Sequence, residues 1–453
     1  MASIEPYSYN IPITCDGKLS NRSRIFNAMK FLISLGMAAA LVWIYQFDIA
    51  ESNAYYGYVK IDLGFSYLAT VTVGMLFLSV INTRNITLPS DIFLAVYSLF
   101  ILWPFFILAH MRGQLNFVEA IQCFSILALP ALIIARPLSI SINLLRVPRF
   151  SEGAIYGISA VAIAVAVLAA SQSSITLSFS FESSYARRQT ARELFPAGSV
   201  LAYANILTMN GLTPLIAYAA GYLRRRLLLL LAVTLSLAYF AIIGAKAPLL
   251  YALIATVFGV ILRRYSPHRF FLLFAAGTLG LLLFALMEEW VTGYSYVADY
   301  FLRRAFTVPT FNNLVYLQFI FGEQWAWFNG AGHIDQPVTF LIGESVLGRD
   351  GLNANTNAFL YALASGGIMV YSITLALTYA IFSVLNAQYK QTGNTTLQFI
   401  ALLFSFLLLE QAVTTVLISS GLILLIILSF FVILRRRSQT PPSHHPESNR
   451  KPC

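Results

Sequence analysis

Residues 227–262 read LLLLLAVTLSLAYFAIIGAKAPLLYALIATVFGVIL. Two apolar runs lie on either side of the short segment GAKAP at positions 244–248. A helix needs ~20 apolar residues to cross a hydrocarbon layer of ~30 Å, and an open sheet leaves backbone groups unsatisfied in lipid. The stretch therefore predicts two membrane-spanning helices joined by a very tight turn.

The same pattern recurs along the whole chain of 453 residues, of which 58% are hydrophobic and 11% charged. A soluble domain of this composition would be nearly all core. We therefore predict an all-α, polytopic integral membrane protein with about twelve transmembrane helices. The expected spans lie near 27–47, 63–81, 92–109, 117–135, 154–171, 198–222, 227–243, 248–262, 270–287, 356–382, 397–415 and 417–434.

Lysine and arginine predict the orientation, because they are enriched in cytoplasmic loops. With both termini in the cytoplasm, most of the 29 basic residues fall on the inner side. Nine remain outside: Lys60, Arg112, Arg187, Arg188, Arg192, Lys246, Arg303, Arg304 and Arg349. The net charge of +10 is thus mainly a topology signal, and we expect no nucleic-acid partner.

Residues 1–437 are predicted to form a single membrane domain, with a disordered cytoplasmic tail at 438–453 that is rich in Pro, Ser and His. Two outer segments are long, at about 172–197 and 289–355. Charged residues within the spans gather at their outer ends, namely Glu119, Lys246, Glu288, Glu289 and Glu410. Charge inside a membrane usually marks function, so we expect a site that water reaches from the outer side.

Cationic side chains of the outer segments are candidates for binding a diphosphate. Lys246 lies in the tight turn between two spans, where it would hold a phosphate oxygen; the alternative is a lysine that reaches to the surface. Arg303 and Arg304 lie in an expected amphipathic helix that Pro309 would break. Arginine matches diphosphate oxygens bidentately, although binding to lipid headgroups explains one of the pair equally well.

A third basic group comprises Arg187, Arg188 and Arg192. Arg188 and Arg192 share a face if the segment is helical, and this face would guide an anionic substrate. Glu182 and Glu193 are close in sequence, so a solvated ion-pair network is the alternative, particularly for Arg187.

The second long outer segment is also suited to sugars. Fourteen of the 52 residues from Glu289 to Phe340 are aromatic, about double the chain's 14% average. Aromatic rings pack on the apolar faces of sugars, although many of these rings belong to an ordinary interfacial belt. Amide and hydroxyl groups suited to sugar hydroxyls are Asn312, Asn313, Tyr316, Asn353, Asn355 and Asn357.

Glycosyl transfer also requires a base for the acceptor hydroxyl. The outer candidates are Glu289, Asp299, His333 and Glu344, and we select Glu344 and His333 as catalytic. The outer segments carry no DxD pair and no metal-ligand spacing around their histidines. We therefore expect no metal and no cofactor, with lysine and arginine neutralising the phosphate charge.

Four stretches resemble the bacterial O-antigen polymerase (Wzy) family of oligosaccharide repeat-unit polymerases. They are Gly244-Ala245-Lys246; residues 301–309 with 312–321; residues 341–344 with 353–359, leading to Gly366-Gly367; and residues 414–417 with Gly421. The resemblance covers roughly the C-terminal half, and the N-terminal half matches in hydropathy alone.

The resemblance implies a C-type glycosyltransferase of the bacterial inner membrane, with a large outer loop containing amphipathic helices. Such an enzyme joins undecaprenyl-diphosphate-linked oligosaccharides at the periplasmic face and releases undecaprenyl diphosphate. Its implied partners are the lipid-linked substrate, the lipid membrane, a flippase and a chain-length regulator. Two alternatives stay open: an O-antigen ligase that transfers polymer to lipid A–core, and a polysaccharide flippase or transporter, which predicts polar residues through the span interiors.

Overall fold

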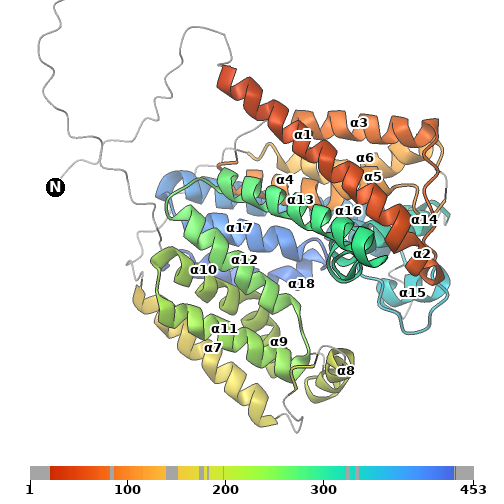
Figure 1. Cartoon of the computed structure of the whole chain (residues 1–453). Helices are drawn as coiled ribbons and strands as arrows, with labels where there is room; N and C mark the ends of the chain where they lie inside the picture. Colours follow the sequence, from red (N-terminus) through yellow and green to blue (C-terminus); the bar gives the residue numbers. More distant parts are fainter. Residues whose placement is uncertain are drawn as a thin grey trace, which may run out of the picture.

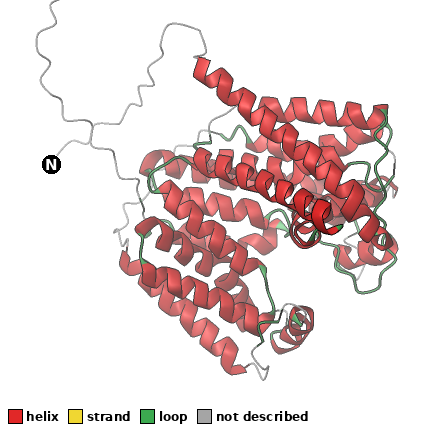
Figure 2. Ribbon diagram, in the orientation of Figure 1, coloured by secondary structure: helices red, strands yellow, loops and turns green. Residues whose placement is uncertain are grey.

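The computed structural model is built from helices, and the described residues form no strand (Figure 2). The described residues are 21–81, 86–113, 115–138, 152–172, 178–180, 183–196, 198–322, 327–331, 336–432 and 434. His333 and the predicted tail at 438–453 lie outside them.

Eight helices in this part of the chain are long and apolar enough to cross a membrane. Four are single helices: α6 (Phe117–Ile134), α11 (Arg226–Ile243), α13 (Pro267–Thr292) and α16 (Ala358–Thr392). A fifth, Gly153–Gln172, lies within α7 (Glu152–Gln172). Three are made of consecutive segments: Phe31–Ser52 runs from within α1 (Asn21–Ile44) to α2 (Ala50–Ser52), Pro89–Leu108 from α4 (Pro89–Tyr97) to α5 (Trp103–Leu108), and Val200–Leu223 from α9 (Val200–Leu207) to α10 (Thr213–Leu223).

Four shorter apolar helices accompany them: α3 (Phe65–Ile81), α12 (Ala247–Leu262), α17 (Thr395–Leu407) and the segment Val413–Leu428, which holds α18 (Val413–Leu417) and α19 (Leu422–Leu428). Each expected span overlaps a long or a shorter apolar helix. The all-α class is confirmed, and the eight long helices support a polytopic membrane protein. A count of twelve spans stays a prediction.

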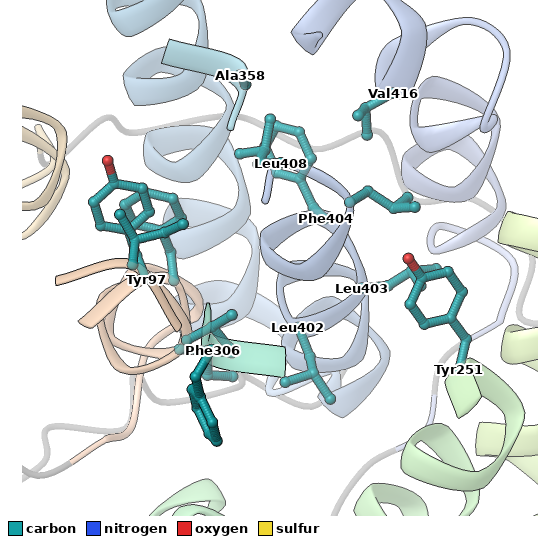
Figure 3. Close-up of a cluster of buried hydrophobic side chains, with 14 of the residues drawn as sticks. Tyr97, Tyr251, Phe306, Ala358, Leu402, Leu403, Phe404, Leu408 and Val416 are labelled. Atoms are coloured by element: carbon teal, nitrogen blue, oxygen red, sulfur yellow. The ribbon is translucent and has the colours of Figure 1, made fainter. Parts of the chain in front are cut away.

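The helices run side by side, with α1 and α3 along one edge of the bundle and α7 along the opposite edge (Figure 1). Among the eight long helices, Pro89–Leu108 has the largest buried share, 78% of its most apolar 18 residues, and therefore lies near the centre. The span α13 has 22% buried, which is the exposure of a lipid-facing helix. Buried side chains such as Tyr97, Phe306 and Phe404 fill the space between the central elements (Figure 3).

Several helices widen locally to a π-helix, and three of the π segments directly precede an X-Pro pair. These are η3 (Ser98–Leu102) before Pro104, η4 (Thr208–Leu212) before Pro214, and η5 (Ala298–Thr307) before Pro309. Proline lacks an N–H and crowds the preceding turn, so a wider turn upstream keeps the helix continuous. A fourth π segment, η1 (Tyr45–Ile49), lies between α1 and α2.

The described part of the segment 289–355, which we predicted to lie outside, is largely helical, with η5 continuing into α14 (Val308–Gly322) and α15 (Val338–Ser345) following. The expectation that Pro309 breaks the helix is wrong. It lies in the first turn of α14, where a missing N–H is tolerated. Most of α14 from Thr310 to Ile320 is buried, and it packs against α16 and α5. Figure 1 shows α2, α8 (Ser184–Leu194), α14 and α15 at one end of the bundle, which is here called the α8 end.

Candidate functional site

The short helix α8 is fixed across the end of α11. Its Ala191 and the following Phe195 form a small buried cluster with Ala169 of α7 and Ile242 of α11. Arg187 strengthens this attachment, because its guanidinium lies 5.2 Å from the ring centroid of Phe240. Arg187 also donates hydrogen bonds within its own segment, at 2.5 Å to Ser183 Oγ and 2.9 Å to the Ser180 carbonyl. Arg187 therefore has a structural role.

The turn between α11 and α12 is built on Gly244. This residue ends α11 in the left-handed conformation, with φ 73°, which glycine adopts without strain. A Cβ atom here would lie 2.3 Å from the Ser184 carbonyl oxygen of α8. Arg188 Nε donates to the Gly244 carbonyl at 3.1 Å. Close approach of α8 to the turn therefore requires glycine, and it places Arg188 beside Lys246.

Four cations from three chain segments form what we call the cation cluster: Arg188 and Arg192 of α8, Lys246 of the turn, and Arg304 of η5. Burial, then the charges of Arg304, Arg188 and Arg187, lower the pKa of Lys246. Burial, then Arg304 and Arg192, lower the pKa of Arg188. Like charges that perturb one another in this way favour the binding of an anion.

Glu410, in the turn after α17, is a carboxylate beside this cluster. Burial raises its pKa, and the charge of Arg188 opposes that rise. The side chain is exposed, so the carboxylate is crowded by protein atoms and still reached by water. Its charge also acts on Tyr251 of α12, which Figure 3 shows beside Leu403 of α17.

A polar chain holds the turn that carries Glu410. Asn210 of η4 donates to Ser420 Oγ at 3.3 Å, and Ser420 Oγ donates to Gln411 Oε1 at 2.9 Å. Gly421 follows in the left-handed conformation. Gln411, the residue next to Glu410, is thus tied to Ser420 and through it to η4, which holds the turn that carries Glu410.

The two adjacent arginines of η5 have different surroundings. Arg303 Nε donates to Asp299 Oδ1 at 2.8 Å and to the Asp299 carbonyl at 3.1 Å. Its guanidinium lies 6.0 Å from the ring centroid of Tyr56. Arg304 is exposed and acts on Lys246 and Arg188. The structure therefore brings Arg304 to the cation cluster and engages Arg303 with Asp299.

The amide groups predicted to bind sugar divide into buried and exposed members. Asn313 Oδ1 accepts from Thr356 Oγ1 at 2.8 Å and from Asn357 Nδ2 at 3.0 Å. Asn357 Oδ1 accepts from two backbone N–H groups at the start of α16. Tyr316 donates to the Ala354 carbonyl at 2.8 Å. These buried side chains attach the 353–357 loop to α14.

Other predicted sugar-binding residues are accessible. Asn353 and Asn355 are exposed, and Asn312 is half-buried and donates to the Asn355 carbonyl at 2.6 Å. The predicted base Glu344 is exposed on α15, where its carboxylate accepts from Gln336 at 3.3 Å. Among the described interactions, no contact joins Glu344 to the cation cluster. His333, the second predicted base, lies outside the described residues.

The sequence predicted Glu410 at an outer span end, but Glu410 was not among the predicted site residues. Its partners come from α8 and α12, which are distant in sequence. A charged residue four positions before the start of the 414–417 stretch was the available signal.

Comparison with protein families, with curated proteins and with solved structures gives no match to this chain. The described part of the chain is helical, and its long apolar helices are compatible with a polytopic membrane protein. Its cation cluster and adjacent carboxylate are suited to binding an anionic group and exchanging a proton beside it.

Proposed function

We propose that this chain is an integral membrane glycosyltransferase that polymerises undecaprenyl-diphosphate-linked oligosaccharide repeat units. In the proposed reaction, the growing glycan passes from its lipid carrier to a sugar hydroxyl of a fresh lipid-linked unit, and undecaprenyl diphosphate leaves. The proposed site faces the periplasm, in an inner-membrane chain with twelve spans and both termini in the cytoplasm. The resemblance to O-antigen polymerases supports this proposal.

The observation that carries the proposal is the cation cluster. Arg188, Lys246 and Arg304 come from separate segments, yet their charges act on one another. A folded protein gains nothing from such repulsion by itself, whereas a diphosphate between these side chains would accept several charge-assisted hydrogen bonds. A phosphate that leaves a sugar is stabilised by the same contacts. These side chains would supply the charge neutralisation without a metal or cofactor.

The test is turnover by the purified protein in proteoliposomes with lipid-linked repeat units. We expect a ladder of products with release of undecaprenyl diphosphate, and the ladder should persist in EDTA. Unextended single units would contradict the polymerase proposal. Transfer of polymer to lipid A–core would indicate a ligase, and movement of unextended units across the bilayer would indicate a transporter.

A further inference from the structure

Glu410 is a carboxylate whose charge interacts with the cation cluster. It lies beside Arg188, at the edge of the cation cluster, where a diphosphate would bind. Water reaches it, so a substrate hydroxyl has access. The polar chain from Asn210 through Ser420 to Gln411 holds its turn in place. A base and a leaving-group site held by different elements can lie on opposite sides of one sugar carbon.

We propose that Glu410 is the general base of the glycosyl transfer, an inference that rests on the proposed function. The Glu410 carboxylate takes the proton from the acceptor hydroxyl as the acceptor oxygen bonds to the anomeric carbon. The bond from that carbon to the diphosphate oxygen breaks, and its electron pair leaves with undecaprenyl diphosphate. The proton ends on Glu410 and passes to water.

The electrostatics around Glu410 suit this role. A base works best when its pKa approaches the working pH, and burial raises the pKa of Glu410 while Arg188 opposes the rise. Glu410 also interacts with Tyr251 of α12, and Arg304 and Arg192 act on Arg188 from its other neighbours. The base is active when deprotonated, so turnover should be lost as the pH falls through the raised pKa of Glu410.

A purely structural ion pair with Arg188 makes a different prediction for stability. A carboxylate whose pKa is raised by folding lowers the stability of the folded state above the unfolded pKa, and stability is regained as the pH falls. Glu410→Gln mimics the protonated group, so it should keep or raise the Tm at neutral pH. Loss of a stabilising ion pair would instead lower the Tm.

The experiment measures kcat, KM, the kcat–pH profile, undecaprenyl diphosphate binding and Tm for Glu410→Gln and Glu410→Asp in proteoliposomes. The matched control is Glu51→Gln, since Glu51 is an exposed partner of Lys60 at the same end of the bundle. For Glu410→Gln we expect kcat to fall by at least about 100-fold. The decline of kcat at low pH, here called the acid limb, should disappear, while the affinity for undecaprenyl diphosphate and the Tm should be retained. Glu410→Asp should recover part of kcat, and Glu51→Gln should behave as wild type.

Two results would overturn this assignment. One is a Glu410→Gln variant whose kcat stays within about tenfold of wild type with the acid limb intact. The other is a fall in Tm that accompanies the loss of kcat in both Glu410 variants, which would identify a structural partner of Arg188. Failure of the wild-type protein to extend lipid-linked units would instead reject the proposed function.

Discussion

At the scale of single residues, Arg303 and Arg304 show how neighbours in one helix take separate roles. The Arg303 side chain is mostly buried, with 14% exposed, and it pairs with Asp299. Arg304 is exposed, and its charge acts on Lys246. Removing one partner of a desolvated pair such as Arg303–Asp299 is destabilising, because the charge that remains has lost its counter-charge. An arginine among other cations is instead available to an anion.

Replacing Arg304 or Lys246 tests the cation cluster. In Arg304→Ala and Lys246→Gln we expect undecaprenyl diphosphate binding to weaken by about tenfold to a hundredfold, because charge-assisted hydrogen bonds contribute ~1.5–3 kcal/mol each. Isothermal titration in detergent measures this, with protein abundance and Tm near wild type. Unchanged affinity in both variants would remove these side chains from the anion site.

Arg303→Ala should behave in the opposite way. Loss of the Arg303–Asp299 pair should reduce the free energy of unfolding by about 1–3 kcal/mol while the affinity for undecaprenyl diphosphate changes little. A thermal-shift assay on the detergent-solubilised protein measures the stability. A normal Tm with abolished binding would show that Arg303 contacts the anion, as the sequence analysis also allowed.

At the scale of elements, prolines within helical segments mark positions where the backbone widens. The sequence predicted that Pro309 ends a helix, but η5 and α14 form a continuous helical segment across it. The π segments before Pro104 and Pro214 follow the same rule. Hydropathy averaging does not detect a wider turn, because the side chains on both sides of it remain apolar. A proline inside a long apolar run is the available sequence signal.

The docking of α8 on the turn after α11 depends on Gly244. Gly244→Ala places a Cβ atom 2.3 Å from the Ser184 carbonyl oxygen and also strains a φ of 73°. We expect α8 to separate from the turn, with turnover reduced by about tenfold or more because the cation cluster is disassembled. Faster proteolysis within α8 would measure the separation.

The matched control is Gly393→Ala. Gly393 also ends a long helix in the left-handed conformation, with φ 63°, but a Cβ atom there meets nothing within 4 Å. It should lose about 1 kcal/mol of stability from backbone strain alone, with normal turnover. Equal effects of the two substitutions on turnover would contradict a special role for the contact between α8 and Gly244.

The start of α16 depends on the side chain of Asn357. This side chain accepts hydrogen bonds from the backbone N–H groups of Phe359 and Leu360. Asn357→Ala should cost about 1–2 kcal/mol of stability, measured as a lower Tm. Asn353→Ala, at an exposed position of the same loop, should leave the Tm unchanged and raise the KM for the saccharide if the predicted sugar contact is correct. An unchanged Tm in Asn357→Ala would contradict its capping role.

At the scale of the whole molecule, hydropathy was enough to locate the apolar helices, because membrane insertion depends on averages over ~20 residues. It was not enough for the outer segment 289–355, where α14 is buried against α16 and α5. That burial depends on side chains distant in sequence, such as the contact between Tyr316 and the Ala354 carbonyl. Glu410 was missed for the same reason, since its neighbours come from other segments.

The distribution of basic residues makes a prediction about the orientation of the entire bundle. Exposed arginines follow α10 at Arg224, Arg225 and Arg226 and follow α12 at Arg264. Both positions lie one helix length away from the turn that holds Lys246. The excess of positive charge near short loops favours the cytoplasm, so the α8 end should face the periplasm, where the proposed lipid-linked substrate would be extended.

Cysteine labelling tests this orientation in a background with Cys15, Cys123 and Cys453 replaced by serine. Ser345→Cys lies on exposed α15 at the α8 end, and Tyr265→Cys lies exposed in the turn between α12 and α13. A membrane-impermeant maleimide should label Ser345→Cys in intact spheroplasts, and it should label Tyr265→Cys after permeabilisation alone. The cysteine-free parent should stay unlabelled in both conditions. The reverse pattern would show that the cation cluster faces the cytoplasm. It would contradict a periplasmic polymerase, because the glycan would then lie on the opposite side of the membrane from its site of extension.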